Sequence, residues 1–347
     1  MTNYRTYRVI LEVKSSVVTP FQADTLFGTL CWGIRFLEGE KDLKEFIDNS
    51  LMENPPLIIS DGFPESYLPK PILAPLKTKE SEELVETCYG KEKKELIRGI
   101  MKLKELSKLH LIPKDYLFKY VENLSSIQIG KDFLIAKFKE PAKESQVNLR
   151  NAFNRLTARV QEGGLFSETE TYYPPESRIN FYAKINESLF SLTRLKNLLT
   201  GYLELSGYGA DKSAGRGNIK FINIEDSDLP HVDQSNAFTS LSSFVPKAYD
   251  PSNGFYDPIL KYGKLGEHYA SGKTSKLDRS GRVIGMNPFK KPLYMFRAGS
   301  TFFLDGSPLK EYYGRVVDNV HWDPEIIHYG LAFPLGVKIV ENMEDLK

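Results

Sequence analysis

Cysteine, histidine and net charge are all scarce in this sequence of 347 residues. It has two cysteines, Cys31 and Cys88, and five histidines, and its basic residues outnumber its acidic ones by one. Two cysteines are too few for a disulfide framework, and neither lies in a CxxC or Cys/His cluster, so no structural zinc site is expected. A non-specific polyanion binder would be far more basic. Any surface for nucleic acid must therefore be local.

Long hydrophobic runs are missing as well. The longest candidate, LFGTLCWGI, is ended by Arg35, whereas a membrane-spanning helix needs about 20 apolar residues. The opening MTNYRTYRVILEVKSS alternates and carries charges, so no signal peptide is expected. No histidine pair has HxH or HxxxH spacing, which gives no support to a metal site, and we expect no cofactor. Together these absences predict a soluble, cytoplasmic protein.

The chain does contain enough apolar residues for real cores. Hydrophobic residues make up 41% of it and aromatic residues 12%, so global disorder is not expected. The length predicts two domains, and the polar stretch DSDLPHVDQSNA (226–237) is the expected linker. Beyond it, short strand-like segments rich in glycine, proline and aromatic residues indicate a β-rich second domain.

The first part of the chain alternates strands with helices. TYRVILEVKS places Tyr7, Val9, Leu11 and Val13 on one face, which predicts a half-buried strand. A helix follows, ended by Gly39. Further on, 178–187 and 218–225 are typical of strands, and 188–205 is typical of a helix. This order of elements fits a ferredoxin-like βαββαβ unit with insertions.

The start of the first helix carries a possible catalytic group. Asp24, in TPFQADTLFG, has the character of a catalytic carboxylate or of a helix N-cap, and Thr25 is a second candidate cap. The capping preference of aspartate favours the structural role. No acidic pair stands out at a spacing that suits two-metal chemistry.

Two segments interrupt the pattern of the first domain. PPLIISDGFPESYLPKPILAPL is punctuated by prolines and is expected to be irregular. Residues 77–108 mix both signs of charge densely, with leucines and isoleucine at helical spacing. This predicts a helical insertion at the surface whose charges are more typical of a solvated face than of a partner site.

The stretch VNLRNAFNRLTARVQEGGLFSETETYYPP supports two structures. As a helix, it would turn Leu149 and Phe153 inward and place Arg155 and Arg159 on the opposite face. As extended chain, it would form a long hairpin turned by the glycines at 163–164. Periodicity does not decide between them.

The most unusual loop is SGYGADKSAGRG, residues 206–217. It contains four glycines, Gly207, Gly209, Gly215 and Gly217. Glycine permits positive φ and close approach of another molecule, and successive backbone N–H groups can cradle an anion. A plain turn is the simpler interpretation. Three further residues favour a phosphate site, because they supply two cations and a hydroxyl: Lys212, Ser213 and Arg216.

Residues 261–291 form a local basic segment. They contain eight lysines and arginines against two acidic residues, a net charge of +6 in a chain of +1. The part GEHYASGKTSK is not a P-loop, because five residues instead of four separate Gly266 from Gly272. The segment is either a solvated loop or a basic loop that becomes ordered on RNA. Its candidate RNA-binding residues are Lys273, Lys276, Arg279 and Arg282.

Five sequence segments together resemble one protein family. They are FQADTLFGTLCWGIRFLEGE, YLPKPILAP, NRLTARVQEGGLFSETETYY, GYGADKSAGRG and MFRAGSTFF, in this order. The chain resembles the RAMP-superfamily subunit that caps the crRNA 5′ handle in type III-A CRISPR (Csm) effector complexes. The resemblance runs from about residue 5 to residue 335. The glycine-rich loop alone is common to all RAMP proteins; the five segments together are specific to this subunit.

The resemblance implies an α+β fold of two ferredoxin-like, RRM-type RAMP domains. The first, 1–225, would carry the insertion (77–109) and a thumb hairpin at about 146–173, which favours the extended structure there. The second, 236–347, would be degraded and β-rich. The 77–109 insertion itself does not map onto the family.

The resemblance also implies a function. The subunit would be non-catalytic, would hold the 5′ handle of crRNA and would press its thumb against the guide. It would link the large polymerase/cyclase-type subunit to the first backbone RAMP subunit, with no membrane partner. Lys212 and Arg216 would neutralise phosphates, Ser213 would donate a hydrogen bond, and Arg155 and Arg159 would grip the guide. The handle would be read through unstacked bases.

Two other functions stay open at the level of sequence. One is a metal-independent RAMP endoribonuclease that processes CRISPR precursor RNA; such chemistry usually uses a positioned His, Tyr or Lys, and the first helix has no histidine. The other is a β-rich scaffold whose glycine loop only turns the chain.

Overall fold

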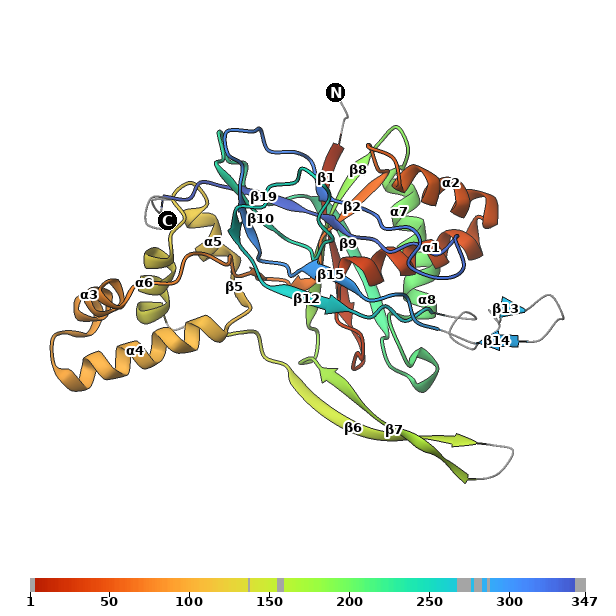
Figure 1. Cartoon of the computed structure of the whole chain (residues 1–347), viewed down its shortest axis with the longest axis horizontal. Coiled ribbons are helices and arrows are strands. Elements are labelled where there is room, and N and C mark those ends of the chain that lie inside the picture. Colours follow the sequence, from red (N-terminus) through yellow and green to blue (C-terminus); the bar gives the residue numbers. More distant parts are fainter. Residues whose placement is uncertain are drawn as a thin grey trace.

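The computed structural model describes residues 4–136, 138–154, 159–266, 276–277, 283–285 and 288–340 (Figure 1). Its first sheet has the strand order β2-β8-β1-β9, all antiparallel, and β3 also pairs with β8. The strands are β1 (Tyr4–Val13), β2 (Leu57–Ile59), β3 (Phe63–Pro64), β8 (Arg178–Asn186) and β9 (Ile219–Asp226).

Helices complete the predicted βαββαβ order. They are α1 (Ala23–Leu37), α2 (Glu40–Ser50) and α7 (Leu192–Leu198), which continues as a π-helical turn, η1 (Leu199–Leu203), and as α8 (Glu204–Ser206). Helix α1 packs against η1, where Gly33 comes close to Leu198 and Tyr202. The order β1-α1-β2-β8-α7-β9, with β1 and β8 at the centre of the sheet, is that of a ferredoxin-like unit. The predicted elements of this unit are confirmed.

Strand β1 shows why the alternation in its sequence matters. Tyr7, Val9 and Leu11 are buried on the predicted face. Ile10, on the other face, is buried too. The proline-rich stretch after α2, predicted to be irregular, contains the short strands β2 and β3 and is therefore partly regular. Its backbone pairs with β8.

The insertion is helical, as predicted. Residues 77–109 contain α3 (Thr78–Tyr89) and α4 (Lys93–Lys108), and the elements beside them in sequence are β4 (Tyr67–Pro69), β5 (Leu111–Pro113), α5 (Lys114–Tyr120) and α6 (Ser126–Ala136). Helices α3, α4 and α6 enclose a small apolar cluster of their own around Leu84, Val85 and Leu134, to one side of the sheets in Figure 1. Gly99 allows the close contact of α4 with α3, since a Cβ there would lie 2.2 Å from a methyl group of Val85.

The ambiguous stretch is a hairpin, β6 (Glu144–Asn154) and β7 (Arg159–Tyr172), which projects from the body (Figure 1). The helical alternative is wrong. The predicted turn at Gly163 and Gly164 is also wrong, because the register pairs Asn151 with Leu165 and Asn154 with Arg159. The two glycines lie inside β7, where the register shifts, and glycine is typical of such bulges.

The C-terminal part forms strands. A second sheet has the order β11-β16-β10-β19, and the pairs β12-β15, β13-β14 and β17-β18 lie outside it. The strands are β10 (Ala237–Ser240), β11 (Gly254–Phe255), β12 (Pro258–Lys261), β13 (Lys276–Leu277), β14 (Val283–Gly285), β15 (Leu293–Phe296), β16 (Thr301–Phe303), β17 (Tyr313–Gly314), β18 (Leu331–Ala332) and β19 (Pro334–Val337). This agrees with the predicted β-rich character, whereas a second ferredoxin-like unit and the exact domain limits stay predictions.

The two halves share one core. The largest buried apolar cluster contains Ile59 and Phe181 from the first half, and Leu241 and Phe333 from the second. Hydrogen bonds cross as well, since the Tyr329 hydroxyl accepts one from the backbone N–H of Ile59 (2.8 Å). No helix in the described part of the chain is long and apolar enough to cross a bilayer.

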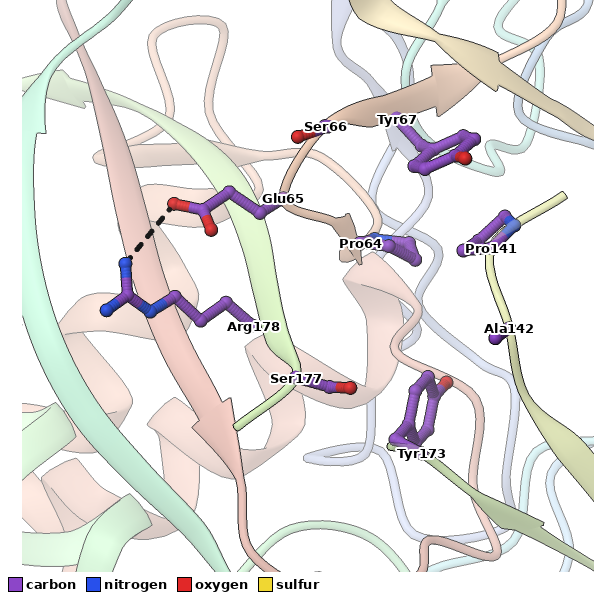
Figure 2. A pocket seen from close by; sticks show the side chains of 9 residues that line it. All are labelled: Pro64, Glu65, Ser66, Tyr67, Pro141, Ala142, Tyr173, Ser177 and Arg178. Atoms are coloured by element: carbon purple, nitrogen blue, oxygen red, sulfur yellow. Dashed lines mark ion pairs between the residues drawn. The ribbon is translucent and has the colours of Figure 1, made fainter. Parts of the chain in front are cut away.

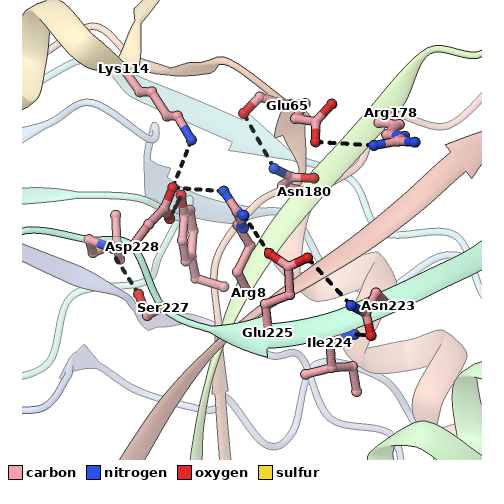
Figure 3. Close-up of polar contacts among 12 residues, drawn as sticks. Arg8, Glu65, Lys114, Arg178, Asn180, Asn223, Ile224, Glu225, Ser227 and Asp228 are labelled. Atoms are coloured by element: carbon pink, nitrogen blue, oxygen red, sulfur yellow. Dashed lines mark hydrogen bonds and ion pairs between the residues drawn. The ribbon is translucent and has the colours of Figure 1, made fainter.

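The predicted linker is tied to the first sheet. Asp228 lies between Arg8 and Lys114, with each cation 2.7 Å from its carboxylate, and it also accepts a hydrogen bond from the Tyr182 hydroxyl (Figure 3). Burial raises the pKa of Asp228, but the bonds from Lys114 and Tyr182 outweigh it, so the net shift is downward. The segment therefore joins the insertion to the sheet instead of being a free tether.

Candidate nucleic-acid interface

The glycine loop connects α8 to β9 and is held at both ends. Tyr208 is fully buried. Its ring stacks on Phe21 at 4.7 Å and its hydroxyl donates to the carbonyl of Pro20 (2.7 Å). The N–H of Gly217 donates to the carbonyl of Ser16 (2.8 Å). Between these anchors, Lys212–Ala214 forms one 3₁₀ turn, and Ser213, Ala214 and Gly215 face solvent.

Three of the four glycines are required for steric reasons in addition to their backbone conformation. All four have positive φ. A Cβ on Gly217 would lie 2.0 Å from the Tyr208 carbonyl oxygen, and equivalent atoms on Gly207 and Gly209 would also meet neighbouring atoms at under 3 Å. At Gly215 nothing lies within 4 Å of the added carbon. Of the four positions, Gly215 is thus the one where the absence of a side chain leaves room for another molecule.

The hairpin has one face toward this loop and one toward solvent. Cross-strand pairing puts Asn148, Arg150, Glu168 and Glu170 on the first face, where they are partly or fully buried. The opposite face carries Val147, Leu149 and Leu165, each exposed by 64% or more. Serines and threonines complete it: Ser145, Ser167, Thr169 and Thr171.

Ion pairs join the hairpin to the loop. Nη2 of Arg216 donates to Oε2 of Glu170 (3.0 Å), and its Nε lies 2.9 Å from Oε1. Arg150 bridges Asp211, in the loop, and Glu168, in β7, the latter at 2.8 Å. Across the six charged residues concerned, which include Lys212, three positive and three negative charges cancel. The loop and the hairpin side chains that face it therefore carry no net charge together.

The predicted RNA-binding residues lie in different surroundings. Arg216 is bound to Glu170, and the Lys212 ammonium lies 5.9 Å from the ring centre of Tyr202. Arg159 is exposed at the start of β7, where it pairs with Asn154 at the end of the hairpin away from Glu170. Lys276 lies in β13, and its side chain is not described. Four others lie outside the described residues: Arg155, Lys273, Arg279 and Arg282.

Asp24 is not the N-cap of α1, and Thr25 is not either. The cap residue is Gln22, and its side chain makes no capping bond. Instead, Oδ1 of Asp61 accepts a hydrogen bond from the N–H of Ala23 (2.8 Å). The Asp24 carboxylate is turned toward Lys261, 2.9 Å away in β12. Sequence reasoning missed this arrangement because the capping carboxylate comes from another segment.

A buried polar cluster surrounds Asp24. His328 Nε2 lies 3.9 Å from Asp24, and His328 is 1% exposed. Burial lowers the pKa of His328 to about 4, so it is neutral at physiological pH. Burial raises the pKa of Asp24, but Lys261 outweighs it and the net shift is downward. Histidine, lysine and aspartate thus meet at the start of α1, but inside the protein.

Asp61 gives a prediction on pH. Burial raises its pKa from the ordinary 3.8 to about 6, so its protonated form is favoured on folding. The protonated Asp61 side chain contributes fully to the stability of the fold below pH 3.8, and this contribution is lost as the pH rises through about 6. Between pH 4 and 7 we expect the stability of Asp61→Asn to gain about 2 kcal/mol relative to wild type. Urea unfolding at several pH values measures this; a difference independent of pH would contradict it.

A pocket of about 210 Å³ lies at the foot of the hairpin (Figure 2). Pro64, Tyr67, Pro141 and Tyr173 provide much of its wall. Glu65 and Arg178, also in the lining, pair with each other at 3.5 Å, so neither offers an uncompensated charge to a ligand. Among the described residues, no three His, Cys, Asp or Glu side chains are arranged to hold a metal ion.

Comparisons with solved structures give the type of fold. A chain from a crystal structure of the Csm1–Csm4 cassette in complex with pppApA matches with a TM-score of 0.52 and 17% identity, over 98% of this chain and 100% of that chain. A chain from the Csm3–Csm4 subcomplex of a type III-A CRISPR-Cas interference complex matches with a TM-score of 0.50 and 16% identity, over 96% and 99%. Csm4 is the subunit common to both structures. The chain shares the fold of these Csm4 chains.

The Csm4-type fold agrees with the family resemblance found in the sequence. The match covers nearly the whole chain, insertion and hairpin included. No protein-family model and no curated protein matches the chain. The handle-binding role of individual residues therefore has to be argued from their own surroundings.

Proposed function

We propose that this chain is the non-catalytic subunit of a type III-A CRISPR interference complex that anchors the 5′ handle of crRNA. The Csm4-type fold over almost the full length is the observation that carries the proposal. The similar chains were crystallised with Csm1 in one case and Csm3 in the other. By analogy, this chain links a large polymerase/cyclase-type subunit to a backbone RAMP subunit, and supports antiviral defence in the cytoplasm.

The glycine loop supports a place for the handle. Ser213, Ala214 and Gly215 expose backbone and one hydroxyl, and Lys212 adds a cation beside them. Since the loop and hairpin charges cancel, the affinity has to come from directed contacts to a few phosphates rather than from a broad positive field. This suits a subunit that holds one defined strand.

The hairpin supports a second contact. Its outward face is aliphatic at Val147, Leu149 and Leu165 and carries hydroxyl groups between them. Such a face packs against bases or against protein, not against phosphates. This agrees with the thumb role that the family resemblance implies, in which the hairpin presses on the guide.

The buried cluster argues against the endoribonuclease alternative. A general acid or base has to reach the proton it transfers. His328, the histidine near Asp24 and Lys261, is enclosed and has its pKa lowered to about 4. We therefore expect the chain to leave bound RNA intact.

The proposal is tested with labelled RNA that carries a repeat-derived 5′ handle, beside a scrambled handle of equal length. The purified chain and the reconstituted complex are titrated over a salt series, and the same samples are run on a denaturing gel. We expect handle-dependent binding and uncut RNA. Lys212→Ala should weaken binding and reduce the salt slope by about one, whereas Lys220→Ala, an exposed cation on β9, should change neither. Cut RNA, or no handle preference in chain and complex alike, would contradict the proposal.

A further inference from the structure

We infer that Arg216 is a positioning residue: its ion pair with Glu170 sets the hairpin against the glycine loop, and it acts on RNA through the hairpin rather than by binding phosphate. The inference rests on the proposed function for the RNA that is bound. It replaces the role of phosphate ligand that the sequence predicts for this arginine.

Glu170 is built to hold Arg216. It is 3% exposed, in the last part of β7. Besides the two contacts from Arg216, its carboxylate accepts hydrogen bonds from the Ser16 hydroxyl and from Nδ2 of Asn148 (2.9 Å). The bonds from Arg216 and Ser16 lower the pKa of Glu170, so it is ionised at physiological pH. One buried carboxylate thus joins both hairpin strands, the loop and the segment after β1.

Two further sets of contacts hold the hairpin in place. Arg150 connects β6 to Asp211 in the loop. At the base of the hairpin, Val17 and Thr171 exchange two backbone hydrogen bonds, of 2.9 and 2.8 Å. The solvent face makes no comparable set of contacts among the described residues. The orientation of the hairpin is therefore set from its loop side.

The free-energy cost of separating Arg216 from Glu170 favours the positioning role of Arg216 over the role of phosphate ligand. A phosphate that took Arg216 would leave the Glu170 carboxylate buried without its cation, and breaking a buried pair in this way is strongly unfavourable. The phosphate would also approach a cluster whose charges already cancel. Lys212 lies directly beside the exposed residues Ser213, Ala214 and Gly215, so it is the better placed of the two to meet a phosphate.

The test compares Glu170→Gln with Arg216→Gln. The first is nearly isosteric, removes only the carboxylate charge and leaves Arg216 in place. If Arg216 positions the hairpin, both changes weaken handle-RNA binding by about tenfold, the scale of one lost charge-assisted hydrogen bond. The salt slope stays unchanged, and the double variant is no weaker than either single one, because both changes remove the same interaction.

A second readout needs no RNA. Hydrogen exchange at the amides of Val17 and Thr171 should become faster in both variants, since the hairpin base loosens when the pair is broken. Lys212→Ala is the matched control and should lower the salt slope without changing this exchange. Hydrogen exchange is measured on the protein alone. A missing handle preference would therefore count against the proposed function, and the exchange rates would still show whether Arg216 positions the hairpin.

The opposite results would overturn the inference. If Arg216 is a phosphate ligand, Glu170→Gln frees it and RNA binding becomes tighter or stays the same. Arg216→Gln alone then weakens binding and reduces the salt slope by about one. Unchanged exchange at Val17 and Thr171 in both variants would equally exclude the positioning role.

Discussion

Gly217→Ala is expected to lower the free energy of unfolding by about 3 kcal/mol or more, since it combines a strained backbone with a steric clash. Gly217 has a φ of +68°, and the new Cβ would lie 2.0 Å from the Tyr208 carbonyl oxygen. The Tyr208 carbonyl cannot move away easily, because Tyr208 is buried and its N–H donates a hydrogen bond to the Gly217 carbonyl (2.8 Å). The clash can therefore be removed only if the loop breaks the contacts that hold its two ends.

Gly215→Ala is the matched control. Its φ of +81° is equally unfavourable for alanine, but nothing lies within 4 Å of the added carbon. We expect a loss of about 1 kcal/mol from the left-handed backbone alone. Urea unfolding of the two variants separates clash from strain. Equal losses at both positions would show that the packing of Tyr208 against Gly217 is not what requires glycine in this loop.

Lys261→Met is expected to cost about 2 kcal/mol, because it breaks a partly buried ion pair and leaves the Asp24 carboxylate without its nearest cation. The Lys261 ammonium lies 2.9 Å from Oδ2 of Asp24 and also bonds the side chain of Gln22. Asp24 is 11% exposed, and His328 beside it is neutral. Since Lys261 belongs to β12 and Asp24 to α1, the pair also joins the two halves of the chain.

Two further variants separate the pair from general effects. Asp24→Asn together with Lys261→Met removes both charges and should recover most of the loss. Arg5→Met breaks the ion pair between Arg5 and Asp226, whose side chains are 58% and 73% exposed. It should leave the free energy of unfolding nearly unchanged, because exposed ion pairs contribute little. If the double variant is as unstable as Lys261→Met, the cost comes from packing of the lysine stem and not from the stranded carboxylate.

The sequence was sufficient where a structure depends on neighbouring residues. The alternation of Tyr7, Val9 and Leu11 predicts β1, and the elements around it follow with the ferredoxin-like order. The cap of α1 was out of reach, because Asp61 lies 38 residues from Ala23. Local capping preference selected Asp24 instead. Only the fold shows that this carboxylate serves a lysine 237 residues away.

The phosphate site in the glycine loop stays a prediction from the sequence. Residue types in the glycine loop indicate phosphate contact, and the loop is exposed at Ser213 and Gly215. Sequence cannot distinguish a glycine required by the chain itself, such as Gly217, from one that leaves room for a ligand. It also cannot show that Arg216 already has a partner in Glu170, 46 positions earlier. The hairpin was ambiguous because its apolar residues fit both periods.

The central claim is that the glycine loop holds the handle of the guide. The most direct measurement places 4-thiouridine at single handle positions in crRNA, cross-links it in the assembled complex and maps the adducts by mass spectrometry. If the loop holds the handle, we expect adducts on residues 206–217 of this chain for at least one handle position. We expect none there when the label is in the distal part of the guide. Handle adducts confined to other segments or other subunits would contradict it.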